Sequence, residues 1–324
     1  MRRFALLLLG LLPASAVPAR AQLSPPYLGA WGAYGYETGA FRHCGAVAVD
    51  GDGDVFVADE DNERVQKFTA RGAFLLAIGA GLPDTLQFSR PAGLACSRDG
   101  KLYVADWGNN RVEVFSAATG EFVQQWGTYG SGPGEFDRPS AIGVDYNGRV
   151  YVGDLGVGRI QVFLADGSYY GTILLPPYQG EAAEARAMCI TPGGRIYITD
   201  GNGQRVIEYL TTGQIVVVWG RYGMALGQLW GVNGVATDPS GNVYVAEEVN
   251  ERVQVFTANG TALGFIGGPG SGDGLFGAAS GIAFDPVGDM FVSDSGNDRV
   301  EKFGGSGITP ARRTTWGRIK ALYH

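Results

Sequence analysis

Short apolar runs alternate with polar, turn-forming residues along most of this chain. Residues 101–115, K-L-Y-V-A-D-W-G-N-N-R-V-E-V-F, contain two such runs around a D-W-G-N-N segment. The runs are rich in β-branched and aromatic residues, and Asp, Gly and Asn favour a tight turn between them. The stretch therefore predicts a β-hairpin. Because apolar residues occupy both faces of its strands, we expect each hairpin to be covered on both sides.

Versions of this hairpin occur six times along the chain. An acidic residue ends the first run of every copy, and successive acids are separated by 47, 48, 46, 47 and 47 residues. These acids are Asp59, Asp106, Asp154, Asp200, Glu247 and Asp294, and an arginine stands five residues after each. Such a period indicates a stacked or radial repeat. We interpret the acid–arginine pairs as structural links between the two strands, and as exposed pairs that contribute about 0–1 kcal/mol each.

Two further predicted strands flank each hairpin. A short apolar run precedes it across a turn such as D-G-D-G or D-P-S-G, and a run that often ends in Trp-Gly or Ile-Gly follows it. Four antiparallel strands repeated about every 47 residues are typical of a propeller blade. The sequence therefore predicts an all-β fold, a six-bladed β-propeller of four-stranded antiparallel blades.

The N-terminal segment supplies a strand that the sixth copy lacks. Residues 27–32, Y-L-G-A-W-G, match the fourth strand at residues 122–127 but follow no hairpin. The sixth copy has only three strands before the G-G-S-G of residues 304–307. We therefore predict that the N-terminal strand completes the last blade and closes the ring, which removes exposed sheet edges.

The two ends of the chain differ from the repeats. Residues 1–21 combine a basic start, a short apolar run and an A-x-A site, which predicts a signal peptide cleaved after Ala21. The run is shorter than the ~20 residues of a membrane span. We therefore expect a secreted or periplasmic protein without a membrane span, with the propeller at residues 22–303. Residues 304–324 form a basic C-terminal tail, for which packing beneath the ring and disorder both stay open.

The repeat pattern V-x-V-A-D-x-x-N-x-R-V-Q-x-F resembles the NHL repeat. Residues 55–68 match it, and residues 243–256 match it with Glu in place of Asp. All six copies carry the pattern in phase, although Val157 and Gly203 replace its Asn, which implies rearranged loops in two units. The family fold is a six-bladed β-propeller. The resemblance does not fix an activity, because NHL propellers include protein-binding and RNA-binding modules and related propellers include lyases and lactonases.

Composition excludes one class of partner. Without Arg2, Arg3 and Arg20 the 25 basic residues fall to 22 against 32 acidic residues, so the mature chain has a net charge of −10. A body this acidic repels phosphate backbones, and we expect no nucleic-acid partner. The three cysteines are odd in number and a propeller of this size needs no staples, so we predict no structural disulfide.

Catalytic and metal-binding motifs find little support. Residues 50–54, D-G-D-G-D, imitate the start of a calcium loop but lack its distal glutamate and coincide with a turn found in all six copies. The chain has two histidines, too few for a histidine zinc site, and no Ser-His-Asp spacing or G-x-S-x-G motif. We predict no metal site and no cofactor.

The candidate ligand-binding residues lie where the loops vary. The hairpin between the second and third strands of a blade opens on the same face as the connection to the next blade, and function is usually grafted on such loops. At the start of the inner strands, basic side chains gather on consecutive blades of an otherwise acidic body, which favours an anion. The predicted ligand-binding residues are Arg90, Arg138, Arg186, Asn233, Trp107 and Trp230. The alternative is that the arginines pair with Glu135, Asp137 and Glu184 and only hold loops together.

These observations favour a monomeric, non-enzymatic binding scaffold for a protein, glycan or small anionic ligand on the loop face. The alternative belongs to a different class: a metal-dependent hydrolase or lyase with an axial active site, as in lactonase-like propellers. Such a site needs several convergent acidic or amide side chains near the axis. At the starts of the inner strands only Glu184 and Asn233 qualify.

Overall fold

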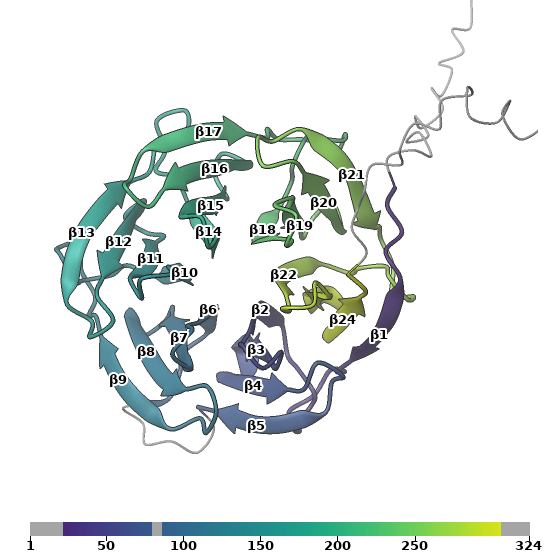
Figure 1. Cartoon of the computed structure of the whole chain (residues 1–324), viewed down its shortest axis with the longest axis horizontal. Coiled ribbons are helices and arrows are strands. Elements are labelled where there is room, and N and C mark those ends of the chain that lie inside the picture. The colour runs from purple at the N-terminus through teal and green to yellow at the C-terminus, as the bar shows by residue number, and fades with distance from the viewer. Residues whose placement is uncertain (1–21, 80–85, 306–324) are drawn as a thin grey trace, which may run out of the picture.

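The computed structural model of the protein describes residues 22–79 and 86–305. Within these residues the chain forms six four-stranded antiparallel sheets, arranged as blades around a central axis (Figure 1). The predicted six-bladed propeller is therefore confirmed. No helix in this part of the chain is long and apolar enough to cross a membrane. The predicted signal peptide, residues 1–21, and residues 306–324 of the predicted tail lie outside the described residues.

The first five blades each use four consecutive strands, which follow one another from the axis outward (Figure 1). Blade 1 consists of β2 (Cys44–Val49), β3 (Val55–Asp59), β4 (Arg64–Phe68) and β5 (Phe74–Ile78). Blade 2 consists of β6 (Pro91–Cys96), β7 (Lys101–Asp106), β8 (Arg111–Ser116) and β9 (Phe122–Trp126). Blade 3 consists of β10 (Pro139–Val144), β11 (Val150–Asp154), β12 (Arg159–Phe163) and β13 (Tyr169–Leu174). Blade 4 consists of β14 (Ala185–Ile190), β15 (Arg195–Asp200), β16 (Arg205–Leu210) and β17 (Ile215–Trp219).

Blade 5 consists of β18 (Val232–Thr237), β19 (Val243–Glu247), β20 (Arg252–Phe256) and β21 (Ala262–Gly267). Blade 6 combines β22 (Ala279–Phe284), β23 (Met290–Asp294) and β24 (Arg299–Phe303) with the N-terminal strand β1 (Tyr27–Trp31). The 3₁₀ turns η1 (Glu60–Asn62) and η3 (Ser295–Asn297) lie in the hairpins of blades 1 and 6.

The hydrophobic core consists of wedges between neighbouring blades. In the described residues, six clusters of buried side chains each combine residues from two adjacent blades. In one of them Val57 and Phe68 of blade 1 meet Phe291 and Val300 of blade 6. The second and third strands are buried on both faces for this reason, as the continuous apolar runs predict.

The ring is closed by β1, as predicted. This strand pairs antiparallel with β24 on the outer side of blade 6, where Trp31 lies opposite Val300; in Figure 1 the purple strand flanks the yellow one. The indole of Trp31 packs 5.9 Å from the ring of Phe68 and 6.0 Å from that of Phe291. One residue from the start of the propeller thus fixes the seam between its first and last blades.

Each blade also holds a buried acid–arginine pair where its second strand meets its third. Asp59 lies opposite Arg64 in register, with 2.8 Å between Oδ2 and Nε. The other five pairs span 2.7–3.1 Å, and all six acids are fully buried. The expectation of exposed pairs is therefore wrong. The reason is that the loop from the preceding blade covers the hairpin: Arg64 Nη2 donates to the carbonyl oxygens of Glu37 and Ala40.

The closing strand generates a prediction about stability. Replacing Trp31 with Ala should lower the free energy of unfolding by about 3 kcal/mol, because it removes the ring contacts that join blades 1 and 6. Leu28 on the same strand is 52% exposed, and Leu28→Ala should cost less than about 0.5 kcal/mol. Denaturant unfolding of both variants tests this, and equal losses would mean that the seam does not depend on Trp31.

One position in the third strands holds Gln in blades 1, 3 and 5, Glu in blades 2 and 6, and Ile in blade 4. Gln161 of blade 3 donates from Nε2 to Glu135 O at 2.6 Å and accepts at Oε1 from Gly134 N at 2.8 Å. Glu113 holds the equivalent place in blade 2 and is fully buried. Burial raises the pKa of Glu113 to about 8, with Asp106 adding to the rise and Arg111 opposing it. Burial likewise raises the pKa of Glu301 in blade 6 to about 7.

Glu113 therefore makes stability depend on pH. The folded protein keeps a proton that the unfolded chain releases above about pH 4.5, so stability should fall as pH rises from there to about 8. Glu113→Gln should reduce this loss of unfolding free energy by about 1.4 kcal/mol for each unit of pKa difference that it removes. Glu301 should account for part of the pH dependence that the variant keeps. Gln161→Glu is the matched opposite and should steepen the fall. Unfolding curves across this pH range that coincide for all three proteins would contradict the prediction.

Candidate functional site

The hairpins between second and third strands and the connections between blades meet on one face of the ring. A cavity of about 220 Å³ opens there at the axis. His43, Glu60, Arg90, Trp107, Arg186, Asn233 and Glu248 contribute side chains to its lining. A narrower space of about 60 Å³, lined mainly by the inner strands, shares Glu60, Arg186 and Asn233 with it. We call the larger cavity, of about 220 Å³, the mouth.

Three arginines stand on consecutive blades in or beside the mouth, each with a carboxylate partner. The pairs are Arg90–Glu60 at 3.4 Å, Arg138–Asp137 at 3.1 Å and Arg186–Glu184 at 2.6 Å. The arginine side chains remain 50%, 45% and 47% exposed, respectively. The pairing predicted as the alternative is thus present for Asp137 and Glu184, whereas Glu135 accepts from Gly132 N instead. Because the guanidiniums keep about half of their surface in water, they retain donors that can reach a ligand.

The backbone that carries these side chains is held in an uncommon conformation. His43, Arg90 and Arg138 have φ values of 58°, 56° and 61°, and the equivalent residue in blade 5 is Gly231, at 69°. Only glycine adopts this left-handed region without steric cost. Two of the amides are anchored to the preceding blade: His43 N donates to Asp298 Oδ1 at 2.9 Å and Arg138 N to Asn110 Oδ1 at 2.8 Å. Long polar side chains therefore occupy positions where glycine would fit more easily.

The ring of Trp107 lies beside two of the three arginines. The guanidinium carbon of Arg90 lies 5.2 Å from the centre of its ring, and that of Arg138 lies 6.0 Å away. These distances fit cation–π contacts, which orient a guanidinium without consuming its hydrogen-bond donors. Trp107 itself is only partly buried, so part of its ring is open to solvent.

Four of the six predicted ligand-binding residues line the mouth: Arg90, Arg186, Asn233 and Trp107. Arg138 does not line it, and its guanidinium carbon lies 6.0 Å from the ring centre of Trp107, which does. Trp230 does not line it, because its ring packs 5.3 Å from that of Tyr222 in the loop between blades 4 and 5. The six residues stay a prediction as ligand contacts.

Acidic residues form the other side of the mouth. Glu60 Oε2 lies 3.4 Å from His43 Nδ1, and a hydrogen bond with Glu60, aided by the nearby charges of Glu60, Asp61 and Glu248, raises the pKa of His43 above 6.5. A Cβ on Gly45 would overlap with Glu60 Oε1. The carboxylate therefore reaches over the backbone of the inner strand, an approach that the sequence signals only as a glycine. The mouth presents both signs of charge, with the guanidiniums on blades 2 to 4.

Across residues 22–79 and 86–305, no group of three or more His, Cys, Asp or Glu side chains is placed to hold a metal ion. The three cysteines are free thiols, and burial raises the pKa of Cys44 well above its usual value. The arrangement at the mouth can bind and orient charged groups, and His43 with Glu60 can hold a proton there.

Comparisons with known proteins agree with this architecture. A family model described as a 6-bladed beta-propeller matches residues 86–212, and the model of the NHL repeat matches residues 41–68 and 229–256. The chain is an NHL-repeat six-bladed β-propeller. A search of curated proteins found no match to this NHL-repeat propeller.

Solved structures resemble the NHL-repeat propeller at low sequence identity. Virginiamycin B lyase from Staphylococcus aureus has a TM-score of 0.58 and 14% identity, over 81% of this chain and 94% of that one. An auxiliary nutrient binding protein from Bacteroides ovatus has a TM-score of 0.62 and 15% identity, over 82% of this chain and 69% of that one. Its namesake from Bacteroides thetaiotaomicron has a TM-score of 0.62 and 14% identity, over 83% and 70%. At these identities the likeness shows the fold alone.

The left-handed backbone at the mouth gives a testable difference between two substitutions. Arg138→Gly should leave the free energy of unfolding unchanged or raise it by up to about 1 kcal/mol, because glycine relieves the left-handed strain while the exposed ion pair contributes little. Arg138→Val removes the same charge but places a β-branched residue in that conformation, and should lower stability by about 1–2 kcal/mol. Chemical denaturation distinguishes the two, and equally stable variants would show that the backbone there carries no strain.

Proposed function

We propose that this NHL-repeat propeller is a non-enzymatic binding protein that holds a small anionic ligand, such as an acidic sugar or a peptide carboxylate, at the mouth. The observation that carries the proposal is a set of three half-exposed arginines on consecutive blades, two of which line the mouth together with the partly buried indole of Trp107. Arginine forks suit carboxylates, and an aromatic face beside them suits a sugar ring or a flat side chain.

The location of the charges supports the same proposal. The mature body carries a large excess of acidic residues, so a cluster of guanidiniums at one opening is a local positive region that focuses anions. The resemblance in fold to proteins named as auxiliary nutrient binding proteins is compatible with a binding role. Export by the predicted signal peptide would place the mouth in the periplasm or outside the cell, where a soluble ligand can reach it. We do not propose a metal-dependent enzyme, because the described residues offer no convergent donor set.

The proposal is tested by binding measurements on matched variants. The wild-type mature protein, the Arg90→Gln, Arg186→Gln double variant and the Arg98→Gln variant are screened on arrays of acidic glycans and acidic peptides, and hits are measured by calorimetry at low and high salt. Arg98 is the control, because its guanidinium stacks 4.2 Å from the exposed ring of Tyr146 on the opposite face. The double variant should lose about tenfold or more in affinity, and Arg98→Gln should lose nothing.

Lowering the pH should strengthen anion binding. As pH falls through the raised pKa of His43, this side chain gains a positive charge beside Arg90. His43→Gln should remove that part of the pH dependence.

If no array compound binds, or if the wild type, the double variant and Arg98→Gln bind the same compounds with the same affinity and salt response, the mouth is not an anion site.

A further inference from the structure

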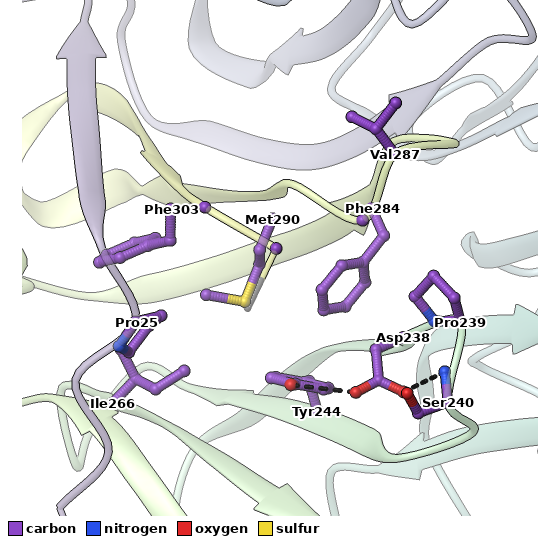
Figure 2. A pocket seen from close by; sticks show the side chains of 13 residues that line it. Pro25, Asp238, Pro239, Ser240, Tyr244, Ile266, Phe284, Val287, Met290 and Phe303 are labelled. Carbon is purple, nitrogen blue, oxygen red and sulfur yellow. Dashed lines mark hydrogen bonds between the residues drawn. The ribbon is translucent and has the colours of Figure 1, made fainter. Parts of the chain in front are cut away.

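Another cavity lies between blades 5 and 6 on the face opposite to the mouth. Its volume is about 210 Å³. Figure 2 shows the apolar side chains of Ile266, Phe284, Met290 and Phe303 directed toward the same space. The polar side of the cavity is already satisfied, because Asp238 accepts hydrogen bonds from Tyr244 and Ser240 (Figure 2). The walls therefore favour an apolar or backbone occupant.

The other five spaces between blades are covered by the chain itself. In blades 1 to 5 a turn joins the third strand to the fourth, and each turn has a glycine with φ between 73° and 87°. A Cβ on that glycine would come within 2.4–3.5 Å of a residue in the fourth strand of the preceding blade. The contacts are Gly72 with Trp31, Gly120 with Ile78, Gly167 with Trp126, Gly213 with Ile173 and Gly260 with Trp219. A glycine turn thus covers five of the six junctions between blades.

The sixth junction lacks this cover in the described residues because of how the ring closes. Since β1 supplies the fourth strand of blade 6, no turn leads from β24 into it. Ile266, near the end of β21, is the equivalent of the fourth-strand residues that meet a turn glycine at the other junctions. At this junction Ile266 lines the cavity. The chain leaves β24 along the wall: Gly304 N donates to Pro26 O at 2.7 Å and Gly305 N to Asp289 Oδ1 at 2.9 Å.

The sequence beyond Gly305 repeats the turn spacing. In blades 1, 3, 4 and 5 the turn glycine stands four residues after the aromatic residue that ends or nearly ends the third strand: Phe68 and Gly72, Phe163 and Gly167, Tyr209 and Gly213, Phe256 and Gly260. Gly307 stands four residues after Phe303.

We propose that the cavity between blades 5 and 6 binds residues 306–308 of this same chain, with Gly307 against Ile266 in the turn used by the other blades. The occupant is short and neutral, which suits the apolar walls, and Gly305 already lies at the cavity. The proposal is independent of ligand binding at the mouth.

Methyl NMR of methionine-labelled mature protein tests this occupant. Met290 lines the cavity, whereas Met188 and Met224 lie elsewhere and serve as internal references. Truncation after Gly305 should shift the Met290 methyl resonance and lower Tm by about 2–4 °C. Truncation after Thr309 keeps the turn and should change neither the resonance nor Tm.

A pair of substitutions separates the turn from the rest of the segment. Gly307→Val should act like truncation after Gly305, because a β-branched residue cannot take the left-handed conformation. Ser306→Ala is the matched control, since the equivalent Arg71, Asp166 and Asn259 are exposed, and it should have no effect. Three results would each overturn the proposal: a Met290 resonance that is the same in all variants, a shift that depends on protein concentration because a second copy supplies the segment, or a bound apolar molecule in native mass spectra that survives truncation.

Discussion

The buried acid–arginine pair in each blade fixes more of this propeller than any other contact. The acid accepts from the arginine across the hairpin and also from a backbone amide just before its own inner strand, as when Asp154 accepts from Arg159 and from Asp137 N. The arginine in turn donates to carbonyl oxygens of the loop that arrives from the preceding blade, here those of Gly132 and Glu135. Because breaking any of these bonds would leave a charge unpaired away from water, the loop, the inner strand and the hairpin are held as one unit. Six such units in a ring leave little freedom between blades.

The buried acid–arginine pair and its hydrogen bonds also determine where side chains can be placed around the mouth. Arg138 lies between Asp137, whose amide donates to the buried Asp154, and the start of β10 at Pro139, so the buried pair sets its backbone position. The backbone there is left-handed, and the guanidinium carbon lies 6.0 Å from the ring centre of Trp107, which lines the mouth. The repeated scaffold therefore supplies six equivalent positions around one opening. What differs from blade to blade is the side chain at each position, and this difference gives the mouth its chemistry.

Closure by a strand from the other end of the chain has a second consequence. It satisfies the outer edge of blade 6 and packs Trp31 against Phe68 and Phe291. It also separates the third and fourth strands of that blade in the sequence, so that the turn joining them elsewhere is missing from the described structure. The cavity at Ile266 and Met290 follows from the same topology that makes the ring stable. The two faces of the ring consequently differ, with charged side chains at the mouth and an apolar recess at the junction of blades 5 and 6.

The sequence by itself determined the all-β class, the number of blades, the strands of each blade and the closure by β1. Strand alternation, turn residues and a constant spacing are local signals, and the copies reinforce one another because every unit must fit the same neighbours. Only the tertiary structure decided that the acid–arginine pairs are buried, that Trp230 packs on Tyr222 and not at the mouth, and that Glu60 reaches over Gly45 toward His43 and Arg90. These outcomes depend on how loops from different blades cover one another and on which charged side chains come within a few ångströms. The distances between these side chains are set by how the loops and blades pack together, and no local pattern in the chain encodes them.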